Sequence, residues 1–149
     1  MQAYVVSRPG GPEVLELQTI PDPVAKKGQV LIDIYAFGLN RAEAITRMGG
    51  SFDAVKFPRV IGIECVGKVL ECPGGELAVG QIVAAAMGGL GRNHDGSYAE
   101  KTVARVSNVF PVDTSLDWVR LGAIPETYFT ARGCCYEVMN IAYQSKVVV

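Results

Sequence analysis

Glycine and proline interrupt this chain at short intervals, and that spacing limits what it can fold into. The 149 residues contain 17 glycines and 8 prolines, and the glycines occur singly or in pairs without forming a tract or a repeat. The apolar segments between them are short and recur roughly every 8–12 residues up to about residue 112. Such spacing is typical of short strands joined by turns, so we predict a small β-barrel or sandwich with one inserted helix.

Seven segments of this region are predicted strands, because each is apolar and ends near a turn-forming residue. They are residues 3–7, 14–20, 29–37, 60–70, 81–87, 96–103 and 108–112. The segment 29–37 is mostly apolar on both faces and is predicted to be a central strand. The inserted helix is expected over residues 41–48, where Gly49 and Gly50 end it.

The pattern changes to helical after residue 112, so the predicted fold class is mainly β with late helices. Thr114 and Asp117 have the spacing of a capping box, which should start a short helix through Leu121. Pro125 marks the start of a second helix, with Glu126 in its first turn. Residues with helical spacing then form one stripe that is predicted to be buried: Tyr128, Ala131, Cys135 and Val138.

Composition excludes several classes of function. The chain has 14 Lys and Arg against 15 Asp and Glu, and the resulting net charge of −1 argues against a nucleic-acid partner. No apolar run approaches the roughly 20 residues of a membrane helix, and the N-terminus lacks the order of a signal peptide. We therefore expect a cytoplasmic protein without a membrane partner. The spacing of the cysteines matches no zinc pattern: Cys65, Cys72, Cys134 and Cys135.

The sequence also lacks the common catalytic and cofactor motifs. His94 is the single histidine, which leaves too few ligands for a zinc site, so no metal is expected. It is too close in sequence to Asp95 and Ser97 for a catalytic triad and is expected to be a solvated loop residue. Residues 91–96 have the glycine spacing of a phosphate loop without its lysine, and no G-x-G-x-x-G occurs.

Two residues allow both a structural and a functional interpretation. Asn40 can cap the helix at 41–48, with Glu43 completing a capping box, or its amide can be a polar anchor in a cleft. Glu64 lies in an apolar run, where a carboxylate is costly to bury unless it is paired. It can form an ion pair with one of three arginines, or it can be a site carboxylate. The three candidates are Arg41, Arg47 and Arg59.

Five short motifs follow one another along the chain: the opening residues 3–15, G-L-N-R-A-E at 38–43, G-I-E-C-V-G-K-V at 62–69, G-S-Y-A-E at 96–100 and A-I-P-E-T-Y-F-T-A at 123–131. Their order resembles that of a known family, the zinc-free, quinone-oxidoreductase-like medium-chain dehydrogenases/reductases. Each motif is short, but the five occur in the family's order and together cover essentially the whole chain. The resemblance implies a GroES-like, partly open β-barrel that forms the catalytic domain.

The resemblance also implies a division of the chain and a cofactor. Residues 1–122 would be the GroES-like catalytic domain, and residues 123–149 the connecting helix and first strand of a nucleotide-binding Rossmann domain. The chain would then be a truncated form of a longer NADPH-dependent enzyme and inactive on its own. Asn40 and Thr130 would bind the cofactor. Ile45, Phe52 and Tyr128 would line the pocket for a quinone or activated alkene.

Departures from the family pattern refine this expectation. Zinc-bearing relatives would have a Cys at about Asn40 and a His at Ile63, and neither is present here, which implies zinc-independent chemistry. Phe52 stands where several relatives have a Tyr, and a phenyl ring cannot donate a proton. The resemblance therefore favours a quinone, or a similar acceptor that is protonated from solvent.

A function of another class is also consistent with the sequence. The barrel can be a stand-alone binding or scaffold module, with residues 147–149 as a strand edge that pairs with a second copy to form a homodimer. A co-chaperonin would explain the barrel but not the two late helices.

Overall fold

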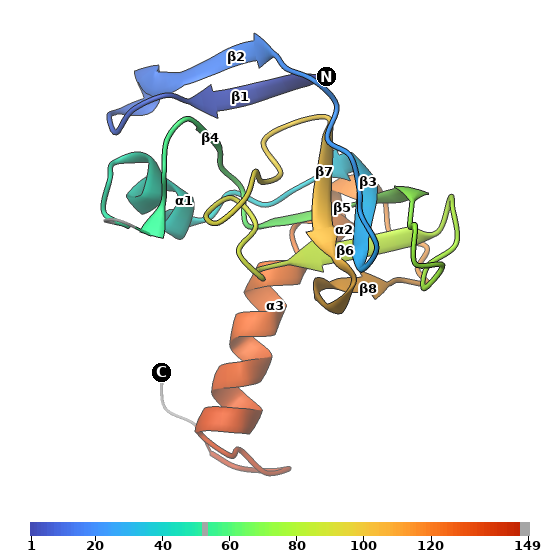
Figure 1. The fold of residues 1–149 in the computed structure, drawn as a ribbon. Coiled ribbons are helices and arrows are strands. Elements are labelled where there is room, and N and C mark those ends of the chain that lie inside the picture. Colours follow the sequence, from blue (N-terminus) through green and yellow to red (C-terminus); the bar gives the residue numbers. More distant parts are fainter. Residues whose placement is uncertain (52–53, 147–149) are drawn as a thin grey trace.

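The computed structural model describes residues 1–51 and 54–146, which form two antiparallel sheets with a few helices (Figure 1). The smaller sheet has the strand order β2-β1-β4, and the larger one has the order β7-β3-β5-β6-β8. A mainly β fold with late helices, predicted from the spacing of the breakers, is confirmed.

The eight strands lie close to the predicted segments. They are β1 (Gln2–Val6), β2 (Leu15–Thr19), β3 (Gln29–Ala36), β4 (Arg59–Val60), β5 (Glu64–Glu71), β6 (Ile82–Ala86), β7 (Lys101–Arg105) and β8 (Val109–Pro111). The helical elements are η1 (Pro12–Val14), α1 (Arg41–Arg47), η3 (Val106–Asn108), α2 (Trp118–Gly122), α3 (Pro125–Arg132) and a π-helical turn, η4 (Gly133–Val138). The largest shift is at residues 96–103, whose strand begins only at Lys101.

The segment 98–100 joins the two sheets into a partly open barrel. The backbone N–H of Tyr4 in β1 donates to the Tyr98 carbonyl at 2.8 Å, and that of Glu100 donates to the Gln2 carbonyl at 3.0 Å. On its other side the Glu100 carbonyl accepts from the N–H of Ile34 in β3 at 2.8 Å. One short segment therefore makes backbone hydrogen bonds to a strand of each sheet. These bonds hold the β1–β2 hairpin against the larger sheet.

The main core lies on the larger sheet. Strand β3 pairs with β5 on one side and β7 on the other, which confirms that it is an interior strand. Its inward side chains Val30 and Ile32 are fully buried. The cluster around them consists of Cys65, Val69, Val83, Ala85, Ala104 and Val109. These are small and β-branched residues, which pack densely between pleated strands.

Of the two late helices, α3 begins at the predicted residue and α2 does not. Pro125 is the first residue of α3 and Glu126 lies in its first turn, as predicted. The capping box at Thr114 is wrong, because α2 begins only at Trp118 and its cap is Asp117, whose side chain accepts from the Arg120 backbone N–H. Asp117 therefore caps the helix itself. Within the described residues, no helix combines the length and apolar character needed to cross a bilayer.

The predicted burial of the α3 stripe is wrong. Tyr128 is 65% exposed, Val138 is 80% exposed, and Ala131 is also exposed. Figure 1 shows why: α3 starts against the body and then projects away from it. It packs against β5 and β6, and Phe129 contacts Phe110 of β8 at a ring distance of 4.9 Å. A helical stripe predicts a face that can be buried, but not the element that buries it.

Candidate functional site

Asn40 lies at the turn between β3 and α1, where it has the predicted role of a helix cap. It is the N-cap of α1, and its backbone N–H donates to Glu43 Oε2 at 2.8 Å. Its side-chain amide is also occupied, because Nδ2 donates to Glu64 Oε1 at 2.7 Å. The cap is therefore confirmed, and the amide is in addition held in one orientation by a carboxylate that can only accept.

Glu64 is buried, with 1% of its surface exposed, and the predicted ion pair with an arginine is wrong. Its second oxygen, Oε2, accepts from the backbone N–H of Glu126 at 2.8 Å, in the first turn of α3. Unpaired N–H groups at a helix start carry partial positive charge and can stabilise a carboxylate without a cation. Of the proposed partners, Arg59 is bonded to Asp95 instead.

A glycine is needed beside this carboxylate. A Cβ atom at Gly38 would overlap Glu64 Oε1. The glycine of the G-x-N segment therefore lets the carboxylate approach the turn that carries Asn40. The glycine at position 38 thus has a steric explanation in this chain.

Glu43 is a second buried carboxylate, and the sequence predicts only its part in the cap. It is 2% exposed, and its Oε1 accepts from the backbone N–H of Ile63 at 2.9 Å. Its Oε2 accepts from the Tyr98 hydroxyl at 2.8 Å as well as from Asn40. Burial, followed by the hydrogen bond to Glu43, raises the pKa of the Tyr98 phenol, so the hydroxyl remains a donor.

The four side chains of Asn40, Glu43, Glu64 and Tyr98 are called the carboxylate bridge below. They join the β3–α1 turn, the start of β5, the segment 98–100 and the first turn of α3. In the part of the chain that the structure describes, no salt bridge reaches either carboxylate. All their partners are neutral donors, so the bridge can hold the Asn40 amide rigidly at the surface of the turn.

The other described residues of the predicted site have exposed side chains. Thr130 is exposed on α3, and its hydroxyl donates to Glu126 Oε1 at 2.9 Å. Asn40 and Thr130 are thus connected through Glu64 and Glu126. Ile45 on α1 is 41% exposed, and Tyr128 is not a core residue. Phe52 lies outside the described residues.

Neither of the two cavities described below contains these predicted residues. One cavity, of about 680 Å³, lies beneath the β1–β2 hairpin, and the other, of about 290 Å³, lies between β1 and β3. Tyr98 lines the smaller cavity and stacks on Phe37 at a ring distance of 4.9 Å.

The cysteines and the histidine form no cluster. All four cysteines are free, and burial, with a smaller effect of Glu64, raises the pKa of Cys65 to about 12. His94 lies half-buried in its loop, with Nδ1 3.2 Å from the Asp95 carbonyl oxygen. Among residues 1–51 and 54–146, no group of three His, Cys, Asp or Glu could hold a metal ion.

A partly open antiparallel barrel is the architecture of a GroES-like domain. The chain belongs to the alcohol dehydrogenase GroES-like domain family, whose model matches residues 26–114. Within it, the chain is similar to quinone oxidoreductases of the medium-chain dehydrogenase/reductase type, which confirms the resemblance found in the motifs.

Three curated relatives illustrate this similarity. The quinone oxidoreductase of Homo sapiens is 35% identical over 136 residues, and that of Lama guanicoe is 33% identical over 136 residues; each alignment covers 88% of this chain and 39% of the relative. The Escherichia coli (strain K12) protein named "Probable acrylyl-CoA reductase AcuI" is 27% identical over 134 residues, covering 90% of this chain and 41% of the relative.

Solved structures support the same fold. The quinone oxidoreductase from Coxiella burnetii superposes with a TM-score of 0.84 at 26% identity, covering 93% of this chain and 45% of that one. A mycobacterial protein solved in complex with NADPH gives a TM-score of 0.81 at 28% identity, covering 98% of this chain and 43% of that one. The chain thus spans about two fifths of the length of the curated relatives it matches.

Proposed function

We propose that this chain is the substrate-side catalytic domain of an NADPH-dependent oxidoreductase that transfers hydride to a quinone or an activated alkene. The carboxylate bridge is the observation that carries the proposal. It holds the half-buried Asn40 amide at the β3–α1 turn and connects it, through Glu64, to the first turn of α3. The quinone oxidoreductase relatives and the neighbour solved with NADPH support it from outside the chain.

Asn40 is suited to orient a ligand. An amide nitrogen carries two hydrogens, and Glu64 accepts only one of those on Nδ2, so the second can be donated to a ligand oxygen. Because a carboxylate acceptor fixes which end of the amide is nitrogen, this donor is oriented before the ligand arrives. Such preorganisation places a reacting group without a further loss of entropy on binding.

The residues of this chain fit one edge of NADPH. The Asn40 amide and the Thr130 hydroxyl are polar groups that suit the carboxamide and ribose of a nicotinamide nucleotide. When bound, NADPH supplies the hydride, and this chain contributes orientation and part of the pocket. The chain contains no G-x-G-x-x-G, so we place the pyrophosphate site in a Rossmann domain that begins after residue 122, where α2 ends.

The proposed acceptor pocket is formed by apolar and aromatic residues. Ile45 and Tyr128 present exposed side chains, and Phe52 would add a ring without an acidic proton. The acceptor would then take its proton from solvent, which favours a quinone over an alkene. Zinc is not required in this proposal, because an Asn and an Ile stand where zinc-bearing relatives would have ligands. The free cysteines are consistent with a cytoplasmic setting.

Titration of the isolated 149-residue chain with NADPH tests the binding half of the proposal. We expect NMR amide shifts around Asn40 and Thr130, and a Kd weaker than about 1 mM, because the pyrophosphate site is missing. Asn40→Ala should abolish these shifts, and Asn93→Ala, at an exposed loop asparagine, should leave them unchanged. Micromolar affinity, or shifts confined to another surface, would contradict the proposal.

A chimera tests the catalytic half. This chain would replace the matching part of the Coxiella burnetii quinone oxidoreductase, whose fold it superposes on. We expect NADPH oxidation that depends on added benzoquinone, and a loss of at least about tenfold in kcat/KM for Asn40→Ala. A folded, NADPH-binding chimera without any turnover would reject the catalytic role.

A second candidate function is self-association of the chain as a binding module. The observation that favours it is the apolar surface on α3 and η4, where Tyr136 is 63% exposed and Met139 is 53% exposed. Exposed apolar patches of this kind often mark protein–protein contacts. The C-terminal strand expected to pair, residues 147–149, lies outside the described residues.

A further inference from the structure

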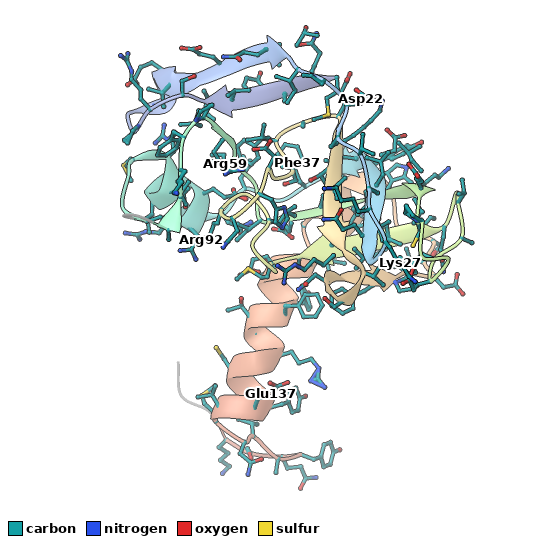
Figure 2. All side chains as sticks on the ribbon, viewed as in Figure 1. Asp22, Lys27, Phe37, Arg59, Arg92 and Glu137 are labelled. Carbon is teal, nitrogen blue, oxygen red and sulfur yellow. The ribbon has the colours of Figure 1, made fainter. Side chains whose placement is uncertain are left out.

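The cavity beneath the β1–β2 hairpin is separate from the carboxylate bridge and is called the hairpin cavity here. Its lining comes from β1, β2, the segment 20–23, the first residue of β3, β4, the loop at 94–95 and β7, with no residue of α1 or α3. Its volume of about 680 Å³ is within the range of small-molecule sites, roughly 300–1,000 Å³. Figure 2 shows Asp22 and Arg59, two of its charged residues, on the hairpin side of the molecule.

Most of the cavity wall is apolar. Val5 of β1, Val60 of β4 and Val103 of β7 face it together with Ile20 and Pro58. Val5 and Val60 also belong to a buried cluster beneath the hairpin, so this part of the wall is held in place by packing. An apolar wall of this kind stabilises the carbon body of a ligand and leaves its orientation to a few polar groups.

Arg59 is the polar group that is best fixed in position. Its side chain is only 16% exposed, and one terminal nitrogen donates to Asp95 Oδ1 at 3.0 Å. The same oxygen accepts from the Val60 backbone N–H at 3.0 Å, which holds the carboxylate in place. The Nε atom of Arg59 is buried and has no partner among the described residues. Arg59 lines the cavity and its terminal nitrogens make one described bond, so N–H groups at that end of the guanidinium remain for an acceptor-rich ligand.

The balance of charge around the cavity favours a single negative charge. Lys101 and the N-terminal ammonium of Met1 are both paired with Asp22, and Arg59 is paired with Asp95, so three cations face two carboxylates. Donors are also in excess, because a guanidinium has five N–H groups and an ammonium three, and each makes one described bond to an acid. The two acids would repel a dianion more strongly than a monoanion.

We propose that the hairpin cavity binds a small organic monocarboxylate. Its apolar body packs on Val5, Ile20 and Val60, and its carboxylate accepts hydrogen bonds from Arg59, with Lys101 adding positive potential. This site is a ligand-binding function apart from hydride transfer. It does not depend on Asn40 or on the proposed cofactor.

Benzoate is a suitable probe, because it joins a compact apolar ring to one carboxylate. Titrated into the isotope-labelled 149-residue chain, it should shift the backbone amides of Val60, Asp95 and Thr102 in a saturable way. The expected Kd is about 10 mM or lower, the value typical of a nine-heavy-atom ligand of ordinary efficiency. Benzyl alcohol, with a similar shape and no charge, should bind at least about tenfold more weakly.

Two variants and a matched control identify the recognising groups. Arg59→Gln should weaken benzoate binding by about tenfold or more, and Lys101→Gln by about threefold. Arg92→Gln removes a positive charge from an exposed residue of the neighbouring loop that does not line the cavity, and should change nothing. Lys101 does not contact Asp95, so its variant remains informative if loss of Arg59 disturbs the loop.

Three results would overturn the proposal. The first is the absence of saturable shifts up to about 50 mM benzoate, several times the expected Kd. The second is equal affinity for benzyl alcohol, which would make the cavity an apolar pocket without anion recognition. The third is a set of shifts that maps to the smaller cavity between β1 and β3.

Discussion

The buried glutamates are the residues on which the site geometry depends most. A carboxylate without a cation is costly to bury unless its oxygens accept hydrogen bonds, and here each oxygen accepts at least one. Each such bond to a charged group is worth roughly 1.5–3 kcal/mol. Their loss should therefore be measurable in the stability of the whole domain.

We expect Glu64→Gln to lower the free energy of unfolding by about 1–3 kcal/mol in urea denaturation. The amide can accept at only one of its two positions, so it must direct an NH₂ group towards Asn40 Nδ2 or the Glu126 N–H. Glu71→Gln at the exposed end of the same strand is the matched control and should lie within about 0.5 kcal/mol of wild type. Equal stability of the two variants would show that Glu64 is not bonded as described.

Cys65 and Cys134 should differ strongly in reactivity. The thiolate is the reactive form, and with a pKa of about 12 Cys65 is protonated at pH 8, whereas Cys134 is exposed. A thiol-specific reagent should therefore modify Cys134 rapidly in the native chain and Cys65 only after denaturation. Fast modification of Cys65 in folded protein, located by mass spectrometry, would contradict its burial.

The raised pKa of Cys65 also makes the free energy of unfolding depend on pH, in a direction that can be stated. The folded state binds the Cys65 proton more tightly than the unfolded state, whose thiol has its ordinary pKa of 9.0. The free energy of unfolding should therefore fall as the pH rises from about 9 towards about 12. Denaturation midpoints measured across this range, with Cys134→Ser as the control for an exposed thiol, should show that decrease in both proteins.

At the scale of elements, strands β3 and β5 approach so closely at Gly67 that no side chain fits there. A Cβ atom at Gly67 in β5 would overlap the backbone carbonyl of Asp33 in β3. We expect Gly67→Ala to lower the free energy of unfolding by about 2–3 kcal/mol, because the obstacle is a backbone atom of an interior strand. Gly133→Ala, where no atom lies within 4 Å of the added carbon, should be neutral or stabilising by up to about 1 kcal/mol.

The elements differ in how well the sequence predicts them, for physical reasons. Strand positions follow from local breakers and alternation, so they could be predicted to within one or two residues at most sites. Asn40 could be predicted as a cap because its partner Glu43 is three residues away. The burial of Glu43 could not be predicted from the sequence, because its partner Tyr98 is 55 residues away and reaches it only in the folded barrel. The partner of Glu64 could not be predicted either, because the backbone N–H that donates to it belongs to Glu126, 62 residues further along the chain.

At the scale of the whole molecule, the apolar surface on the projecting helix should promote association. Figure 2 shows this helix, with Glu137 on it, standing away from the body. We expect the weight-average mass in sedimentation equilibrium to rise with concentration, and Tyr136→Ser with Val138→Ser to suppress the rise. Tyr4→Ser, at an exposed tyrosine of β1, is the control and should not. A monomer at every concentration would reject the self-association proposal.

The placement of β1 sets an order of events during synthesis. Residues 2–6 are synthesised before the other described strands, and β2 follows soon enough to form a hairpin with them. Their remaining partners, at 59–60 and 98–100, emerge much later. Strand β1 must therefore wait for partners that are made much later before the hydrogen bonds on its second edge can form, and such distant pairing slows folding. Chaperones that hold nascent chains would meet this hairpin while one of its edges is still open.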